Sequence, residues 1–455
     1  MQRTVVINVV GLSDRVIGEN TPFIHQWAAQ KAKRYVEPLV PAVTCSMQST
    51  YLTGKPPAEH GIVGNGWYSR EECEVKFWKQ SNKLVQAPKI WKAARKADPG
   101  FTCANLFWWY NMYSSVDYSV TPRPNYLADG RKIPDVYSHP PQLREHLQKK
   151  LGQFPLFEFW GPRTSIRSSK WIADAAMFTE QLAHPTLTLV YLPHLDYCLQ
   201  KFGHDNGTIK TDLGEIDDLV RQLVTFYESR EVRVALLSEY GITDVSKAVS
   251  LNRVLRKNNW LQVREERGLE LLDAGASRAF AVADHQVAHI YIRDLEDVEE
   301  VKKLLESVEG VEAIWGVPEK QQHGLDHPRS GDLLALARED SWFTYYYWLD
   351  DRKAPDFART IEIHRKPGYD PVEMFADPEI SWLTARIGWK LLKKKLGFRV
   401  LMDIIPLDPA LIRGSHGVVP ADKKDWPLVI SEGPAGPGIL KATQVYNLIW
   451  DQLTN

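Results

Sequence analysis

A threonine precedes a short run that predicts a helix in the segment PAVTCSMQSTYLTGKPPAEHGIVGN at 41–65. Residues 46–52 favour a helix, and Gly54 is a residue type that commonly ends one. A hydroxyl group at a helix N-terminus lies among free backbone N–H groups, where phosphate also binds. Thr44 is therefore a candidate for chemistry on an anionic group, and its alternative role is an ordinary helix N-cap.

The residues that follow Thr44 form a specific pattern, which consists of Thr53-Gly54, Pro57, His60-Gly61 and Asn65. This pattern resembles the nucleophile segment of the type I phosphodiesterase/nucleotide pyrophosphatase branch of the alkaline phosphatase superfamily. The resemblance implies that Thr44 attacks phosphorus and forms a covalent phosphothreonine. It also implies that Asn65 donates its side-chain amide to a phosphoryl oxygen, and the alternative for Asn65 is a turn residue after Gly64.

Three later segments resemble the same family in the same order: YLPHLDYCLQKFG at 191–203, LLSEYGIT at 236–243 and GSHGVVPADKKDWPLVISEGP at 414–434. The resemblance implies an alkaline-phosphatase-like α/β fold and hydrolysis of a phosphoester or phosphoanhydride with two divalent metal ions, commonly zinc. A free threonine hydroxyl is a poor nucleophile at neutral pH, and a metal ion helps by lowering the hydroxyl pKa.

The chain departs from the family at the metal-binding positions, which hold three aspartates and three histidines besides the threonine. In chain order these positions are Val10, Asp196, Gln200, Glu239, Tyr240 and His416. Asp196, Glu239 and His416 are the retained candidates for metal ligands. Valine has no donor atom, and tyrosine binds metal mainly as the phenolate, whose reference pKa is about 10. Gln200 and Tyr240 are interpreted instead as residues that face the substrate.

Three outcomes are open for such a site. The protein holds one divalent metal with Asp196, Glu239 and His416, or it recruits further ligands, or it has lost catalysis and binds a phosphoryl or carboxylate group. The expected metal is zinc, with manganese or magnesium as alternatives, and the count is one or two ions.

Histidines elsewhere in the chain are candidates for recruited ligands. We favour His364 over His194 and His327, because the PGYDP sequence gives His364 a rigid turn context. Its neighbours Arg365 and Lys366 form a basic cluster suited to a phosphate or carboxylate group on the substrate. For each of these histidines the alternative is a hydrogen-bonded structural or surface imidazole.

Short β-branched runs alternate with amphipathic helical stretches, which is typical of a mostly parallel sheet with helices on both faces. The best strands are 4–10, 186–192, 232–237 and 427–431, each apolar on both faces as central parallel strands are. Helices are predicted at 168–183 and 211–229. Ligands gather at the carboxyl ends of strands in such sheets, so we expect Asp196 and Glu239 to lie close together.

The chain is expected to form a core from 1–245 and 346–455, with a small inserted α/β lobe at 246–345. Within the lobe, 280–317 predicts a strand, a helix with an acidic start and a second strand. The basic segment WKLLKKKLGFR at 389–399 is either an ordinary solvated helix face or an amphipathic helix that touches anionic lipid.

Composition excludes several classes of protein. The 455 residues are 44% hydrophobic, and the balance of 56 basic against 57 acidic residues argues against a nucleic-acid partner. Four scattered cysteines predict neither a disulfide framework nor a thiolate zinc site. The apolar N-terminal run is too short for a signal sequence, and no integral membrane span is predicted. We therefore expect a cytoplasmic protein, and the sequence leaves the oligomeric state open.

These observations predict a metal-dependent hydrolase of a phosphorus ester, whether a phosphodiester, a pyrophosphate or a phosphomonoester, acting on a small phosphorylated molecule. Hydrolysis of a phosphonate or a sulfate ester is a further possibility. The alternative from another class is a catalytically inactive phosphoryl- or carboxylate-binding protein on the same scaffold. Retention of the whole Thr44 segment argues against this alternative, because a binding protein has no chemical need of the threonine.

Overall fold

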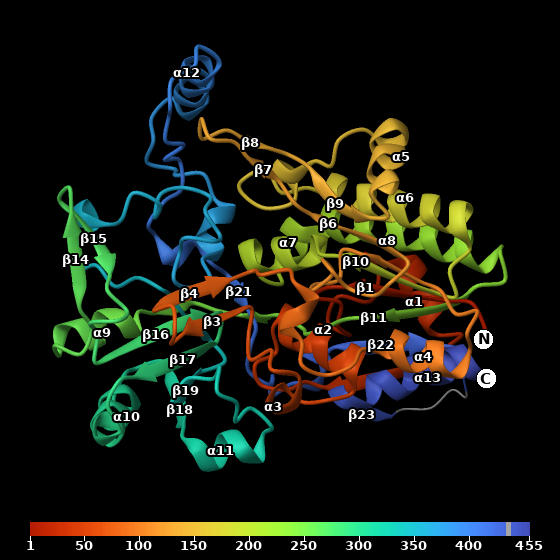
Figure 1. Cartoon of the computed structure of the whole chain (residues 1–455), viewed down its shortest axis with the longest axis horizontal. Coiled ribbons are helices and arrows are strands. Elements are labelled where there is room, and N and C mark those ends of the chain that lie inside the picture. The colour runs from red at the N-terminus through yellow and green to blue at the C-terminus, as the bar shows by residue number, and fades with distance from the viewer. Residues whose placement is uncertain (434–437) are drawn as a thin grey trace.

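A nine-stranded sheet runs through the molecule in the order β23-β2-β22-β11-β1-β10-β5-β6-β9 (Figure 1). The computed structural model describes residues 1–433 and 438–455, so the proline expected after the last core strand, Pro434, lies outside the described residues. The strands of this sheet are β1 (Thr4–Val9), β2 (Ala32–Glu37), β5 (Cys103–Leu106), β6 (Tyr118–Pro122), β9 (Val136–His139), β10 (Leu187–Leu192), β11 (Arg233–Leu237), β22 (Leu428–Ser431) and β23 (Ile439–Lys441).

The middle of the sheet consists of β10, β1 and β11, and β1 pairs in parallel with both neighbours. Every residue of β1 and β10 is buried, as their continuous apolar sequences predict. Thr4 is in register with Leu187 on one side and Arg233 on the other, so the three strands end at a common edge. The predicted strands at 4–10, 186–192 and 232–237 are confirmed.

The fourth predicted strand forms, but it runs in the opposite direction. β22 pairs antiparallel with β11 and antiparallel with β2. All four of its residues are buried. Burial on both faces selects the same apolar residues whichever way a strand runs, so the prediction of a parallel strand at 427–431 is wrong in direction.

Helices cover both faces of the sheet. α6 (Ile166–Ala183), α7 (His194–Phe202) and α8 (Asn206–Glu228) lie on one face, and α2 (Thr44–Thr53), α4 (Ile90–Ala97) and α13 (Val445–Thr454) lie on the other (Figure 1). α6 contacts β10 and α8 contacts β11, while α13 contacts both α2 and β1. The expected α/β sandwich and the helices predicted at 168–183 and 211–229 are confirmed.

A second, antiparallel sheet lies within the expected lobe, in the order β16 (Ala279–Asp284), β17 (Val287–Ile292), β19 (Leu333–Ala337) and β18 (Val311–Trp315). The helix with the acidic start is α10 (Val298–Glu306). The hydrophobic core of the lobe also contains side chains from outside 246–345, among them Tyr68, Phe77, Trp348 and Phe357. The limits of the lobe drawn from the sequence therefore stay a prediction.

The segment at 280–317 contains one strand more than its sequence indicates. A tight turn at His285 and Gln286 joins β16 to β17, and His285 has a φ of 63°. The run FAVADHQVAHIYI contains none of the glycine or asparagine residues that usually mark such a turn. The two strands therefore read as a single apolar run in the sequence.

One helix stands apart from the rest of the molecule. α12 (Leu383–Lys395) projects from the body at the top of Figure 1, and none of its residues is buried. It covers part of the predicted basic segment at 389–399 and ends at Lys395. Within the described residues, no helix combines the length and the apolar character that crossing a membrane requires.

Candidate active site

The segment that carries Thr44 folds as its pattern predicts. Val43 is the N-cap of α2 and Thr44 is the first helical residue, so the threonine does not act as the cap. The Thr44 side chain makes no capping hydrogen bond and is 3% exposed. Gly54 ends the helix with a φ of 67°, in the left-handed region that favours glycine. The free hydroxyl of Thr44 is therefore available for other contacts.

The histidine of the pattern holds the helix in place. α3 (Pro57–His60) follows α2, and His60 Nε2 lies 3.0 Å from Thr50 Oγ1. The backbone N–H of Ile62 donates to His60 Nδ1 at 3.1 Å. Burial lowers the pKa of His60 to about 3, so the ring is neutral at physiological pH. His60 is thus a structural brace between the two helices.

Thr44 lies at the carboxyl edge of the central strands, next to residues from two distant segments. Asp196 is in the first turn of α7 after β10, and Tyr240 follows β11. Thr44 Oγ1 lies 3.0 Å from Tyr240 Oη, and the Tyr240 hydroxyl donates to Asp196 Oδ1 at 3.2 Å. Because the only proton of Tyr240 is used toward Asp196, Thr44 must be the donor in its contact with Tyr240.

His416 completes this cluster from the C-terminal part of the chain. Its Nδ1 donates to the Ala42 carbonyl at 2.7 Å, and its Nε2 lies 3.7 Å from Asp196 Oδ1 without a hydrogen-bond partner. Burial raises the pKa of Asp196 to about 7 and holds the pKa of His416 well below its usual value. The unprotonated Nε2 of His416 therefore faces a carboxylate oxygen in a buried site.

Glu239 lies in the same region but is held by amides. The side-chain amides of Asn8 and Gln48 both donate to Glu239 Oε1, whereas Oε2 is buried without a partner. Burial raises the pKa of Glu239 to about 8. Across residues 1–433 and 438–455, Asp196, Glu239 and His416 do not bring their donor atoms within 4.8 Å of one another. The structure brings the first and last of these predicted ligands within 3.7 Å of each other, and the ligand atoms of all three do not form one close cluster.

Asn65 connects helix α2, which carries Thr44, to the second sheet. Its side-chain oxygen accepts from the Cys45 backbone N–H at 3.0 Å. Its backbone N–H and side-chain amide donate to the two carboxylate oxygens of Asp284, at 2.8 Å and 3.0 Å. Asp284 also accepts from His285 Nδ1 at 2.9 Å. The amide that sequence reasoning directed to a phosphoryl oxygen is thus bonded within the protein.

Four rings form a continuous stack beside the cluster. Tyr240 stacks on His416 with centroids 3.6 Å apart, His416 lies 3.8 Å from His285, and His285 lies 3.7 Å from Tyr369. The Tyr369 hydroxyl donates to Gln200 Oε1 at 3.0 Å. Gln200 therefore lies at the end of this stack and not in open contact with solvent. Sequence reasoning did not assign Asp284, His285 or Tyr369 to the site, because each lies outside the four segments in which the resemblance to the family was found.

The basic segment at 364–366 does not join the cluster. His364 Nδ1 contacts the Phe77 carbonyl at 3.3 Å, and burial lowers the pKa of the imidazole, with a smaller contribution from nearby lysine and arginine side chains. Arg365 is half exposed and pairs with Asp356. Lys366 is 1% exposed and paired inside the fold, so the prediction that it binds substrate needs correction. A cation at His364 would be repelled by basic side chains that the fold brings from other segments, namely Lys79, Lys132 and Arg123.

The two other candidate histidines lie in separate surroundings. His194 Nε2 is 3.0 Å from Asp212 Oδ1 and 3.6 Å from Glu215 Oε2, two residues of α8. These spacings suit ligands of a metal ion, although exposed acidic groups are common without one. His327 Nε2 contacts Gln86 Oε1 at 2.9 Å. Neither histidine is in contact with Thr44 among the described interactions.

Comparison with known proteins identifies the family. Residues 4–370 match the family Type I phosphodiesterase / nucleotide pyrophosphatase. The chain belongs to this family. Two ectonucleotide pyrophosphatase/phosphodiesterases of Saccharomyces cerevisiae, numbers 1 and 2, are 24% and 22% identical to it over 53% of the chain. The matched segments amount to 34% and 48% of those relatives, so the chain spans about half of their length or less.

Solved structures of this phosphodiesterase family and its neighbours share the fold. Human ectonucleotide pyrophosphatase/phosphodiesterase 5 is similar with a TM-score of 0.60 and 15% identity, over 99% of this chain and 95% of that one. Phosphonoacetate hydrolase from Sinorhizobium meliloti, in complex with phosphonoacetate, gives 0.62 and 13%, over 100% and 96%. The murine counterpart of the human protein was solved as an inactive variant with AMP.

The pair of metal ions expected for a phosphodiesterase of this family does not fit the residues present. The position beside Thr44 would be formed by Val10, Glu239 and Tyr240. Val10 has no donor, and burial together with nearby carboxylates raises the pKa of the Tyr240 phenol well above its usual value. Glu239 already accepts two amide hydrogen bonds on one oxygen. This half of the site cannot supply a set of anionic ligands.

The other half fits one cation with two protein ligands. Neighbouring ligand atoms in a tetrahedral zinc site are about 3.4 Å apart, and Asp196 Oδ1 and His416 Nε2 are separated by 3.7 Å. The His416 Nδ1–H donates to a backbone carbonyl, which is the arrangement that orients metal-binding histidines. The buried, unpartnered Nε2 of His416 is therefore consistent with a ligand atom.

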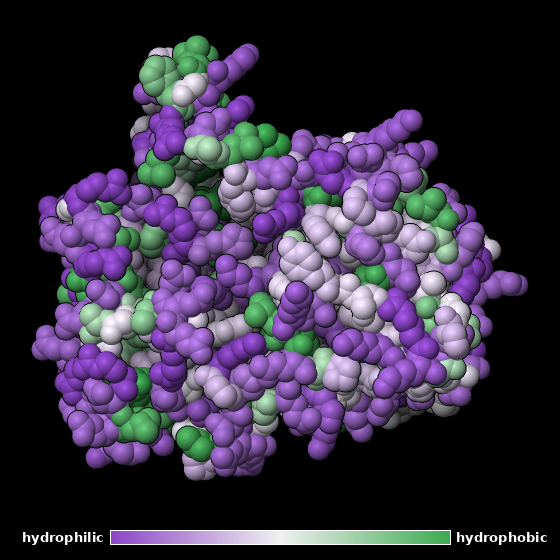
Figure 2. All heavy atoms as spheres, viewed as in Figure 1, coloured by the Kyte–Doolittle hydropathy of each residue, from purple (hydrophilic) through white to green (hydrophobic). Residues whose placement is uncertain are grey.

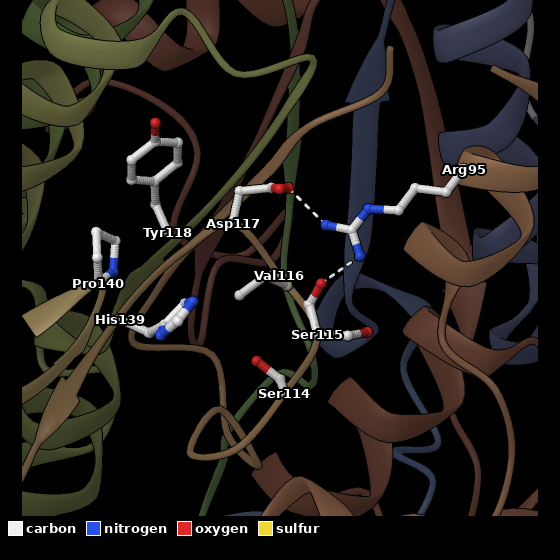
Figure 3. Close-up of a pocket in the computed structure, with 8 residues that line it drawn as sticks. All are labelled: Arg95, Ser114, Ser115, Val116, Asp117, Tyr118, His139 and Pro140. Carbon is white, nitrogen blue, oxygen red and sulfur yellow. Dashed lines mark hydrogen bonds and ion pairs between the residues drawn. The ribbon is translucent and has the colours of Figure 1, made fainter. Parts of the chain in front are cut away.

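A surface hollow elsewhere is separate from this cluster. About 480 Å³ in volume, it is lined by Arg95, Ser114, Ser115, Val116, Asp117, Tyr118, His139 and Pro140 (Figure 3). The Arg95 guanidinium is engaged by the Ser115 carbonyl and, at 2.6 Å, by Asp117. The hollow contains none of the predicted site residues, and its one strong cation is already neutralised.

Proposed function

We propose that the chain hydrolyses a small phosphorus ester, with the oxygen of Thr44 as nucleophile. Membership of the phosphodiesterase family supports the reaction class. The observation that carries the proposal is the contact chain Thr44–Tyr240–Asp196 at 3.0 Å and 3.2 Å. A threonine at the start of a buried helix, aligned by a tyrosine and an aspartate, is more than a binding protein requires.

The contact chain defines the direction of proton movement. The Thr44 proton points to Tyr240, which leaves the oxygen lone pairs free to attack phosphorus. As the bond from Thr44 Oγ1 to phosphorus forms and the bond to the leaving oxygen breaks, the threonine proton passes to the Tyr240 hydroxyl and the Tyr240 proton passes to Asp196 Oδ1, while the leaving oxygen departs as an anion. Hydrolysis of the phosphothreonine by water then returns the hydroxyl. Phosphoryl transfer depends mainly on such positioning and on charge neutralisation.

Asp196 and His416 are the residues that would hold one divalent cation, for which zinc is expected. When bound, this cation supplies positive charge to the phosphoryl oxygens and lowers the pKa of an adjacent hydroxyl. The main-chain N–H groups at the start of α2 offer further stabilisation of an anionic phosphoryl group.

An aromatic layer lies beside the cluster and is proposed to contact the apolar part of the substrate. Tyr369 packs against Trp78 and Trp160, and Trp160 also packs against Tyr197. Trp78 and Trp160 are only partly buried, so this layer extends from the ring stack toward the surface. Because Thr44 and Asp196 are at most 6% exposed, a substrate must displace part of this layer to reach them.

A second function, phosphoryl or carboxylate binding without turnover, is favoured by Glu239. The amides of Asn8 and Gln48 both donate to Glu239 Oε1, so this carboxylate already has two protein partners and only Oε2 is left to bind a metal ion. A protein that only binds its ligand would keep the fold and the helix N-terminus, and it would make no use of the Thr44 hydroxyl.

Metal analysis and ester hydrolysis separate the two functions. The purified chain would be assayed with bis-para-nitrophenyl and para-nitrophenyl phosphate in the presence of zinc, manganese or magnesium. We expect one ion per chain that is lost in Asp196→Ala and His416→Ala. The His194→Ala variant is the matched control, because it removes the histidine of a separate cluster with Asp212 and Glu215.

Turnover that disappears in Thr44→Ala and partly persists in Thr44→Ser would support the hydrolase. Wild-type protein that binds phosphate and cleaves none of a wide panel of phosphate, phosphonate and sulfate esters would establish the binding function instead.

A further inference from the structure

The exposed apolar side chains of this protein are concentrated on one short segment. Of the nineteen large apolar residues exposed in the described part of the chain, seven lie between 382 and 401. They are Trp382, Trp389, Leu391, Leu392, Leu396, Phe398 and Leu401. Clusters of this kind on a folded protein mark interaction surfaces, whereas single exposed apolar residues need no explanation.

The apolar residues of α12 follow the helical repeat on the side that faces away from the protein. Trp389, Leu392 and Leu396 are separated by three and four positions and so share one face. They are 57%, 46% and 66% exposed. The opposite side of the helix carries Leu383 and Ile387, which pack against the small hydrophobic cluster at its base. α12 is therefore an amphipathic helix with an apolar side toward solvent.

Cations flank this apolar side, and the segment from 383 to 402 contains no acidic residue. Arg386 and Lys390 pair with Asp403, at the base of the segment. Lys393, Lys394 and Lys395 have no acidic partner among the described ion pairs. These lysines lie in the last turn of α12, where Lys393 and Lys395 border the apolar face on its two sides and Lys394 lies on the opposite side.

Because of the position of α12, its apolar face is accessible to a partner with a flat surface. The helix projects from the body of the molecule (Figure 1). Hydrophobic atoms gather at its tip with hydrophilic atoms around them (Figure 2). Within the described residues, α12 is an amphipathic helix without a single buried residue.

We propose that α12, together with 396–401, docks this protein onto the surface of a membrane that contains anionic lipid. Tryptophan, leucine and phenylalanine side chains insert into the boundary between headgroups and acyl chains, and the three lysines bind the negative headgroups. A second copy of the chain is a poorer occupant, because it would bring the same unpaired lysines against one another. The segment is an interfacial element and not a membrane span.

Vesicle co-sedimentation of the full chain tests this docking. We expect binding to vesicles of phosphatidylcholine with phosphatidylserine, about tenfold weaker binding to phosphatidylcholine alone, and weaker binding at high salt. The apolar variant Trp389→Ser/Leu392→Ser/Phe398→Ser and the charge variant Lys393→Gln/Lys394→Gln/Lys395→Gln should each lose about tenfold or more in affinity. All six side chains lie on an unburied segment, so circular dichroism and the melting temperature should match the wild type.

A matched control changes exposed residues elsewhere. Leu295→Ser with Lys303→Gln removes an exposed leucine and an exposed lysine from another part of the surface and should bind vesicles as the wild type does. Equal binding of wild type and both α12 variants, or an equal loss in the control, would overturn the proposal. It would also be overturned by wild-type protein that ignores vesicles but dimerises in sedimentation analysis through α12.

Discussion

Replacement of Lys366 by methionine should destabilise the protein rather than weaken substrate binding. The ammonium group lies 2.7 Å from Asp370 Oδ2 and 2.7 Å from Glu373 Oε1, and all three side chains are at most 2% exposed. Burial raises the pKa of Asp370, and the charge of Lys366 opposes this shift. Lys366→Met keeps the aliphatic stem and leaves two buried carboxyl groups without their cation.

The size of the effect follows from this arrangement. Removing one partner of a buried ion pair costs about 3–5 kcal/mol. An unfolding entropy of about 2.1 cal/mol/K per residue gives about 1 kcal/mol/K for a chain of 455 residues. The melting temperature should therefore fall by about 4 °C in differential scanning calorimetry. The compensated variant Lys366→Met/Asp370→Asn/Glu373→Gln should recover most of this loss, because it contains no unpaired buried charge.

The neighbouring arginine supplies the control for this experiment. Arg365 is half exposed and pairs with Asp356 at the surface, so Arg365→Met should change stability by less than about 1 kcal/mol. A Lys366→Met protein that melts with the wild type and shows a raised KM for the ester would refute this reasoning. That result would support the substrate-binding role predicted for Lys366 from the sequence.

Three further predictions concern other parts of the molecule. Tyr240→Phe removes the acceptor for the Thr44 proton and should lower kcat about 10²-fold in the ester assay with little change in melting temperature; an unchanged kcat would show that the proton takes another path. Asn65→Ala and Asp284→Asn should be combined in a double-mutant cycle measured by urea unfolding. We expect a coupling free energy of about 1–2 kcal/mol between the two residues, and strictly additive changes in the free energy of unfolding would contradict the hydrogen-bonded link. Burial lowers the pKa of Lys89 from its ordinary value of 10.5 to about 7. Between these two pH values the unfolded chain therefore binds one proton more than the folded chain. The free energy of unfolding should rise with pH in this range, by about 2 kcal/mol from pH 7 to pH 9. Lys89→Met should remove this pH dependence, and an equal slope in both proteins would assign it to other groups.

The residues that could be found from the sequence are those with local signals. Thr44 stands in a run of turn and helix residues at fixed spacing, and Asp196 and His416 each belong to a short motif next to a buried strand, Leu187–Leu192 and Gly414–Ser415. The central strands have continuous apolar sequences that only a sheet covered on both faces requires. Their common edge then places Asp196 near Thr44 without further information.

The parts that were missed depend on contacts between distant segments. The direction of β22 is decided by its neighbours, since its buried residues suit either orientation. Asp284 and His285 lie at a turn without glycine or asparagine, so neither the hairpin nor its approach to Asn65 has a sequence signal. The lone basic cluster at 364–366 looks available for an anion until the fold brings Asp370 and Glu373 onto Lys366.

The bonds from Asn65 to Asp284 have a mechanical consequence. Through Asn65, the loop beside the threonine is tied at three points, to the first turn of its own helix and to both oxygens of a carboxylate on the other sheet. A displacement of the smaller sheet against the larger one would pull directly on the peptide next to the Thr44 hydroxyl. A ligand or surface that shifts that lobe would thereby change the orientation of this hydroxyl, which is the proposed nucleophile.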